Sequence, residues 1–313
     1  MLTRRHLRIK VFQALYSFQM DEDKSMAAAE KNLQKSIDDI FRLFLFDLAA
    51  LVMVHRFAKE KIELNRQKKL PTAEDLNPKM NFANNRLLNW LSSNAAFLKA
   101  VEEHSISFGD EKEILRNVYK KVMEDERFQE YLAMDAPDLK EDRKMVKYIY
   151  GSYLVDNEVL HEHYEELNMY WSDDLDAAQA MVTKTITAFD ETKDEQSGLL
   201  RLIKNQDDLD FAVSLFRESI KGDAEFEKSI LSKAENWEGD RIATIDIILM
   251  KMALAELISF NQIPVKVTLN EYIELAKQYS TNRSGQFVNG ILDKLQMQWQ
   301  KEGKFKKIGR GLL

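Results

Sequence analysis

The sequence predicts an all-α protein, and three observations lead to this fold class. Glycine and proline are scarce, at ten and four in 313 residues, and Pro71 is the first residue of either kind. Apolar residues recur at helical spacing in most segments. Hydrophobic residues make up 45% of the chain and charged residues 31%, so the chain is long and apolar enough for a large helical core or two domains.

A first helix is predicted from about residue 3 to residue 19. At about 100° per residue, one face of this helix forms an apolar stripe of Leu7, Val11, Ala14, Leu15 and Phe18. Beside it lies a second strip, made of Arg5, Arg8, Phe12, Tyr16 and Gln19, with Arg4 close by. Two interpretations remain open for this strip: an ordinary solvated helix face, or a strip on which arginines neutralise RNA phosphates and an aromatic ring stacks on a base.

The middle of the chain predicts further helices. Residues 25–66 lack glycine and proline and predict one or two long helices, followed by a polar linker with Pro71 and Pro78. Further helices are expected around residues 84–103, 111–133, 141–170 and 175–190. This region contains too many large apolar residues to be disordered.

Near the end of the chain, the pattern predicts two short helices joined by a polar elbow. Pro264 opens the first helix, and the turn Ser280–Ser284 follows it. The second helix begins near Ser284. Its apolar residues at helical spacing are Phe287, Val288, Ile291, Leu292 and Leu295.

Composition and charge exclude several classes of protein. A net charge of −7 argues against a protein that coats nucleic acid indiscriminately, although both termini are basic. Cysteine is absent, which excludes disulfides and thiolate chemistry and is typical of a reducing compartment. The N-terminus lacks the pattern of a signal peptide, and the most apolar run, residues 41–54, is too short to span a bilayer. We therefore expect a cytoplasmic protein without a membrane segment.

The sequence offers little for catalysis or for binding a metal or cofactor. It has no glycine-rich phosphate loop, nucleophile elbow or dinucleotide fingerprint. His161 and His163 lie two residues apart, whereas metal pairs on a helix need a spacing of three or four. Glu158 and His161 have the spacing of a half-site, but no second copy exists. We expect a solvated helix face there, no metal, no cofactor and no enzymatic activity.

Several motifs resemble those of the NusB family of transcription antitermination factors. RRHLR at residues 4–8 and QALYSFQ at residues 13–19 are similar to the N-terminus of that family. NWEGDRIATID at residues 236–246 resembles its central segment, and IILMKMALAEL at 247–257 follows it with Lys251 where arginine is usual. The two C-terminal helices carry its closing signature, PVKVTLNEYIELAK at 264–277 and then FVNGILDK. The resemblance covers residues 1–20 and about 205–295.

This resemblance implies a NusB-like helical bundle interrupted by an all-helical insertion. We expect residues 1–24 and 205–300 to form the bundle, residues 25–204 the insertion and residues 301–313 a basic tail. The implied function is an RNA-binding transcription antitermination factor. It would bind boxA-type single-stranded RNA of ribosomal RNA transcripts together with NusE, a small-subunit ribosomal protein, in the RNA polymerase antitermination complex. Ribosomal RNA cytosine methyltransferases with NusB-like modules need an α/β domain and a catalytic cysteine, and this chain predicts neither.

The resemblance also implies which residues contact each partner. The expected RNA-binding residues are Arg4, Arg5, Arg8, Phe12, Tyr16, Arg283, Gln286 and Phe287. Arg283 lies where relatives often carry acids, and Ile230 lies where some carry a tyrosine, while core packing is the alternative for Phe287. Asp246 and Glu256 are the acids expected to meet the basic partner. The rival function is a helical protein–protein scaffold without RNA affinity, and the sequence leaves open the role of the insertion, the RNA preference and the oligomeric state.

Overall fold

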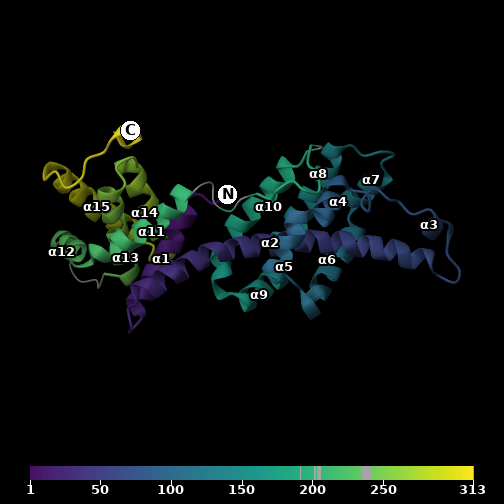
Figure 1. Cartoon of the computed structure of the whole chain (residues 1–313), viewed down its shortest axis with the longest axis horizontal. Coiled ribbons are helices and arrows are strands. Elements are labelled where there is room, and N and C mark those ends of the chain that lie inside the picture. Colours follow the sequence, from purple (N-terminus) through teal and green to yellow (C-terminus); the bar gives the residue numbers. More distant parts are fainter. Residues whose placement is uncertain (191, 201, 203–205, 235–241, 313) are drawn as a thin grey trace. The chain divides into compact units, whose positions relative to one another are not determined.

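The computed structural model describes residues 1–190, 192–200, 202, 206–234 and 242–312. All regular structure in these residues is helical, which confirms the predicted all-α class. The chain divides into two compact units, which we call the central unit (residues 38–202, with Met1) and the terminal unit (residues 2–37 and 203–313). The boundary between them falls within the long helix α2, Met26–Arg66 (Figure 1).

The terminal unit is built around helix α13. It contains α1 (Arg4–Met20), the start of α2, α11 (Gln206–Lys221), α12 (Asp223–Ala234), α13 (Thr244–Ser259), α14 (Val265–Tyr279), α15 (Ser284–Lys301) and the short turn η4 (Gly309–Leu312). Every side chain from Ile248 to Leu257 is buried, because α13 packs against α1, α11, α12, α14 and α15. A helix buried on all sides forms the centre of this unit.

Helix α1 buries a wider face than its apolar stripe predicts. Leu7, Val11 and Leu15 are buried as expected. Arg8 and Phe12 are also buried, with 3% and 5% exposed, so the prediction that they face solvent is wrong. The reason is that α1 packs against both α11 and α13 and also contacts α14, which together cover more than one stripe of a helix.

The two C-terminal helices match their predicted bounds closely. Pro264 directly precedes α14, and α15 begins at Ser284 after the polar elbow. The predicted apolar residues of α15 are all buried, whereas Val267 on α14 is 44% exposed.

The predicted basic tail packs onto the terminal unit as far as it is described. The Ile308 N–H donates to the Asn261 carbonyl at 3.0 Å. The Lys307 ammonium donates to the carbonyls of Leu257 and Phe260, at 3.0 and 3.1 Å. These carbonyls lie at the C-terminal end of α13, where a cation is favourable, so Lys307 caps this buried helix.

The central unit is a bundle of shorter helices around the remainder of α2. It contains α3 (Ala73–Leu76), α4 (Arg86–Ser93), α5 (Ala95–Glu103), α6 (Lys112–Glu124), α7 (Glu126–Ala133), α8 (Leu139–Ile149), α9 (Glu158–Leu167) and α10 (Leu175–Ala188), with short turns η1 (Gly109–Glu111), η2 (Tyr150–Leu154) and η3 (Met169–Asp173). The apolar run of α2 is buried within this unit. In the part of the chain that the structure describes, we found no helix with the length and hydropathy that crossing a bilayer requires.

Most helices expected in this region are divided, and the division occurs at polar caps. Asn94, Asp125 and Asn157 each begin a new helix. Their side chains accept the N–H of the residue three positions later, at 2.8, 2.9 and 3.1 Å. An asparagine or aspartate can therefore end one helix and start the next without any glycine or proline.

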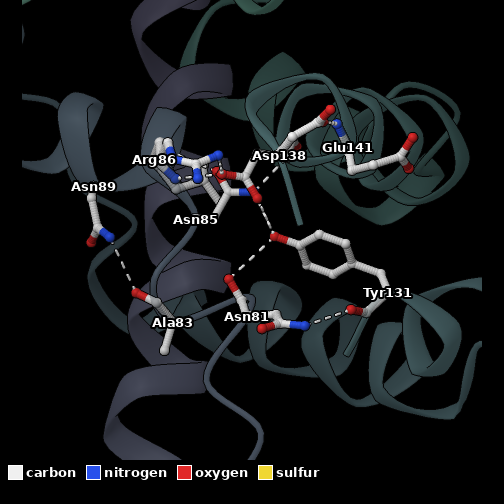
Figure 2. Close-up of polar contacts among 10 residues, drawn as sticks. Asn81, Ala83, Asn85, Arg86, Asn89, Tyr131, Asp138 and Glu141 are labelled. Carbon is white, nitrogen blue, oxygen red and sulfur yellow. Dashed lines mark hydrogen bonds and ion pairs between the residues drawn. The ribbon is translucent and has the colours of Figure 1, made fainter. Parts of the chain in front are cut away.

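A buried polar network joins α7 and α8 to the loop before α4. The Tyr131 hydroxyl donates to Asp142 Oδ1 at 2.6 Å, and Asn85 Nδ2 donates to the Asp142 carbonyl and to the Tyr131 hydroxyl. Figure 2 shows the Tyr131 ring pointing toward Asn81 and Asn85. Asn81 holds the end of α7 by donating to the carbonyls of Tyr131 and Met134. These contacts fix the loop structurally.

Candidate nucleic-acid interface

Residues from both ends of the chain meet where α1 lies against α14. The ring centroids of Phe12 and Tyr279 are 5.4 Å apart, and Tyr16 extends this group with its ring 6.4 Å from Phe12. Tyr279 is the last residue of α14 and is followed at once by the elbow that leads to Arg283. The sequence prediction omitted Tyr279, although its position seven residues after the buried Tyr272 places both rings on one face of the helix.

Four of the eight predicted RNA-binding residues are exposed, namely Arg4, Tyr16, Arg283 and Gln286, and Arg5 is half-buried. Tyr16 is 41% exposed, so its ring is accessible for stacking. Arg4 is held by Asp208, at 3.5 Å from Nε to Oδ1, and its guanidinium lies 4.9 Å from the ring centroid of Phe211. The charge of Arg5 acts near α14, where Lys277 first and Arg5 in addition lower the pKa of Glu274.

Arg8, Phe12 and Phe287 are the three predicted RNA-binding residues that the structure buries. Arg8 donates from Nε and Nη2 to the two carboxylate oxygens of Glu256, both at 2.8 Å. Its Nη1 lies 3.5 Å from Glu271. Burial alone would lower the pKa of Arg8, but the hydrogen bonds and charge of Glu256 raise it above its ordinary value. Arg8 is therefore a structural cation that links α1 to α13, and Phe287, 9% exposed, packs in the core.

Glu256 is fully buried, and all four of its contacts lie within the terminal unit. Besides Arg8, its oxygens accept the hydroxyls of Thr268 at 2.8 Å and Tyr272 at 2.9 Å. Burial and the charge of Glu256 raise the pKa of Tyr272 well above its ordinary value. The expectation that Glu256 lies on a surface and meets a partner is wrong, because the carboxylate neutralises a buried arginine instead.

Asp246 is also buried, with 4% exposed, so it is not a surface acid either. Its Oδ2 accepts the hydroxyl of Ser284 at 2.8 Å. Ser284 Oγ in turn accepts the Thr281 N–H at 3.2 Å. The carboxylate thus fixes the elbow at the start of α15, where the helix dipole favours a negative charge. A second anion at this helix start would be repelled by Asp246, and the exposed polar side chains nearby include Arg283 and Gln286.

Part of the family-like sequence lies outside the described residues. Residues 236–241, most of the NWEGDR segment, belong to this part. Ile230, which stands where some relatives carry a tyrosine, is fully buried in α12.

The histidine cluster of α9 is dispersed in the structure. His161 Nε2 lies 3.5 Å from Gln179 Nε2, whereas the His163 ring packs beside Phe108 and Tyr164. Among the described residues, no group of three or more His, Asp or Glu side chains is placed to hold a metal ion.

Comparisons with known proteins match part of the chain to one family. A sequence model of the NusB family matches residues 175–297. The protein named transcription antitermination protein NusB in Salinibacter ruber is 42% identical over 142 residues, which cover 44% of this chain and 89% of that protein. The proteins of the same name in Chloroherpeton thalassium and Natranaerobius thermophilus are 41% and 40% identical over 104 and 68 residues. These matches cover 33% and 22% of this chain and about half, 49%, of each relative.

No solved structure matches the chain. The Salinibacter ruber protein is nevertheless covered over nearly its whole length at 42% identity. The buried Arg8–Glu256 pair joins the two blocks of sequence, 248 residues apart, in which the family-like motifs lie. This chain belongs to the NusB family.

Proposed function

We propose that the chain is a transcription antitermination factor that binds boxA-type single-stranded RNA of ribosomal RNA transcripts together with NusE. It would act within the RNA polymerase antitermination complex and without catalysis. Family membership and the printed names of its relatives support the antitermination role. The observation that carries the RNA proposal is the packing of Phe12 on Tyr279, which brings α1, with the half-buried Arg5 and the exposed Tyr16, against the end of α14. The elbow with Arg283 follows directly, and Gln286 lies in the first turn of α15.

The exposed groups suit a short single strand. Arg5 and Arg283 would neutralise phosphates, and the Tyr16 ring would stack on a base, an interaction typically worth about 1–3 kcal/mol. Gln286 can donate and accept hydrogen bonds at a base edge. Arg4 would add a positive charge at the edge of this surface, since its exposed side chain is already paired with Asp208. We call Arg5, Tyr16, Arg283 and Gln286 the RNA surface.

The three buried residues of the predicted site hold the helices that carry the RNA surface. Phe12 lies between Tyr16 and Tyr279 and holds α1 against α14. Arg8 anchors the same helix through Glu256. Phe287, the residue after Gln286, is buried at the start of α15. Neither Asp246 nor Glu256 is retained as a direct contact for NusE, because both are engaged inside the chain.

The proposal is tested by the affinity for a boxA-type RNA oligonucleotide against a scrambled one, with and without NusE, across a salt series. With about three phosphate contacts, from Arg4, Arg5 and Arg283, the slope of log affinity against log salt should be about −2, and about −0.7 in the Arg5→Ala/Arg283→Ala variant. The matched control, Lys228→Ala/Lys301→Ala, removes the same charge from exposed positions outside the RNA surface and should keep the slope of the unmodified chain.

Three outcomes decide the proposal. Selective binding that the arginine variant loses and the lysine control keeps supports the RNA surface. Equal weakening by both variants would mean that net charge, rather than this surface, drives binding. If the chain does not distinguish the two oligonucleotides even with NusE present, the RNA proposal fails and the protein–protein scaffold becomes the better description.

A further inference from the structure

The central unit contains a segment with a strongly one-sided charge. No lysine or arginine occurs between Lys147 and Lys184. The same segment carries eight acidic residues, namely Asp156, Glu158, Glu162, Glu165, Glu166, Asp173, Asp174 and Asp176. Helix α9 (Figure 1) and the turn η3 lie in this segment, which carries a negative charge that no lysine or arginine within it offsets.

The four glutamates of α9 are exposed and carry no ion pair with any residue that the structure describes. Elsewhere in the central unit, exposed acids commonly do pair, as Glu60 does with Arg56 and Glu113 with Arg116. The glutamates of α9 therefore remain available to cations from outside the unit.

Apolar side chains lie exposed among these carboxylates. Val159 is 56% exposed, Met169 72% and Tyr170 50%. On the helical wheel Val159 shares its face with Glu162 and Glu166, three and seven positions later. The turn η3, which packs against α9, adds the exposed Met169 and Tyr170. We call these five residues the α9–η3 face.

The opposite side of the same segment is firmly anchored in the unit. Leu160, Tyr164 and Trp171 are almost completely buried, and the Tyr164 hydroxyl donates to Asp47 at 2.9 Å. The exposed Val159, Met169 and Tyr170 therefore lie on a segment whose other side is fixed in the core. Exposed methionine and aromatic side chains on a rigid element are typical of protein interfaces.

We propose that the α9–η3 face is a docking surface for a basic, amphipathic segment of another protein. Lysine or arginine side chains of the partner would pair with Glu162 and Glu166, while its apolar side chains pack on Val159, Met169 and Tyr170. RNA and anionic lipid are disfavoured, since the four exposed glutamates of α9 repel phosphate. A second copy of the chain is disfavoured too, because a two-fold contact would bring the same carboxylates together.

The test uses the full chain and a fluorescent peptide that forms a lysine/leucine amphipathic helix. A lysine/serine peptide of equal charge and a glutamate/leucine peptide serve as comparison probes. The lysine/leucine peptide should bind at least about tenfold more tightly than either of them, since it alone matches both charge and apolar surface.

Two variants locate the site, each with a matched control in the central unit. Glu162→Lys/Glu166→Lys and Met169→Ser/Tyr170→Ser should each weaken binding of the lysine/leucine peptide by about tenfold or more. Glu124→Lys/Glu130→Lys makes the same charge change on exposed residues of α6 and α7, and Leu64→Ser/Leu98→Ser removes other exposed apolar side chains. These two controls should bind as the unmodified chain does.

Each possible outcome has a definite meaning. If the charge control weakens binding as much as the α9 variant, the peptide responds only to net charge and the proposal is wrong. If the lysine/serine peptide binds equally well, the apolar residues take no part and the proposal is also wrong. If sedimentation shows that the unmodified chain self-associates and the α9–η3 variants do not, the face is an interface between copies, which overturns the proposed partner.

Discussion

The two units each bury a carboxylate, and they stabilise it in different ways. In the terminal unit, Glu256 faces the guanidinium of Arg8 and two hydroxyls. In the central unit, the groups that donate to Asp47 among the described residues are the hydroxyls of Tyr150, at 2.5 Å, and Tyr164, at 2.9 Å. Both acids are almost completely removed from solvent. One carboxylate therefore has a counterion and the other has only neutral donors.

This difference shows how far neutral hydrogen bonds can replace the counterion of a buried carboxylate. Burial raises the pKa of Asp47 from 3.8 to about 6, even though the two tyrosine hydroxyls lower it again in part. Near neutral pH the central unit therefore holds a charged group at a free-energy cost. The terminal unit avoids that cost through a full ion pair, but it depends on keeping both partners.

The largest expected effect is that of removing one partner of the ion pair. Arg8→Ala leaves Glu256 buried without its counterion, and the terminal unit should lose about 3–5 kcal/mol of unfolding free energy. Hydrogen-exchange mass spectrometry in denaturant, read from peptides of α1 and α13, measures this loss where it arises. Restoring neutrality with Arg8→Met/Glu256→Gln should recover a large part of it.

A small effect of Arg8→Ala would change the comparison between the two buried carboxylates. A loss of less than about 1 kcal/mol would mean that water or a shift of α1 replaces the guanidinium, as at a surface ion pair. It would also return Arg8 to the candidates for direct RNA contact. The RNA surface is tested by Arg5 and Arg283 for this reason, because Arg283 is exposed and Arg5 is only half-buried, whereas Arg8 is buried.

The next effect concerns Asp47 and depends on pH. The folded state holds a proton on Asp47 up to about pH 6, whereas the unfolded chain releases it near pH 4. Between these values the folded state binds more protons, so this group's contribution to stability falls as pH rises. Relative to Asp47→Asn, the unmodified central unit should lose up to about 3 kcal/mol between pH 4 and pH 7. If the unfolding free energies of the two proteins changed with pH in the same way, the Asp47 carboxylate would be solvated in the folded state.

A second buried group on α2 titrates with the opposite sign. Burial, with the charge of Lys59, lowers the pKa of His55 from 6.5 to about 4, and its Nε2 lies 3.1 Å from the Ala83 carbonyl. Here the unfolded chain binds more protons between about pH 4 and pH 6.5, so stability rises with pH in that range. His55→Gln should therefore remove this rise and leave the falling profile that Asp47 produces, a relative change of up to about 3 kcal/mol between pH 4 and pH 6.5. If the unfolding free energy of the His55→Gln variant did not fall as pH rises, the raised pKa of Asp47 would be contradicted.

The sequence predicted the helices of the terminal unit well because their signals are local. Pro264 and Ser284 mark the starts of α14 and α15, and the apolar spacing gives their buried faces. The division of the central helices was missed, because a capping asparagine such as Asn94 is also common on exposed helix surfaces and in loops. The polar core was missed for another reason: the pair of Arg8 with Glu256 joins positions 248 residues apart, which no local pattern relates.

The candidate site shows the same limit at the level of single residues. Arg5 and Arg8 lie on adjacent angles of one helix, and a helical wheel assigns both to one strip. Their environments differ because α13 and α14 bury Arg8, whereas Arg5 keeps part of its surface in solvent. The family-like motif identifies which arginines matter, whereas only the packing separates a cation that holds the fold from one that is free to meet a phosphate.

The smallest effect is expected at an ion pair with nearly the same geometry on the surface. Arg217 donates from Nε and Nη2 to the two carboxylate oxygens of Glu30, both at 2.7 Å, and links α11 to α2 within the terminal unit. The Arg217 side chain is 54% exposed, so water replaces the lost contacts when it is removed. Arg217→Ala should therefore leave hydrogen exchange in α11 and α1 almost unchanged, far from the loss caused by Arg8→Ala. Equal losses at the two sites would show that the number of hydrogen bonds, and not burial, sets the contribution of an arginine–glutamate pair in this protein.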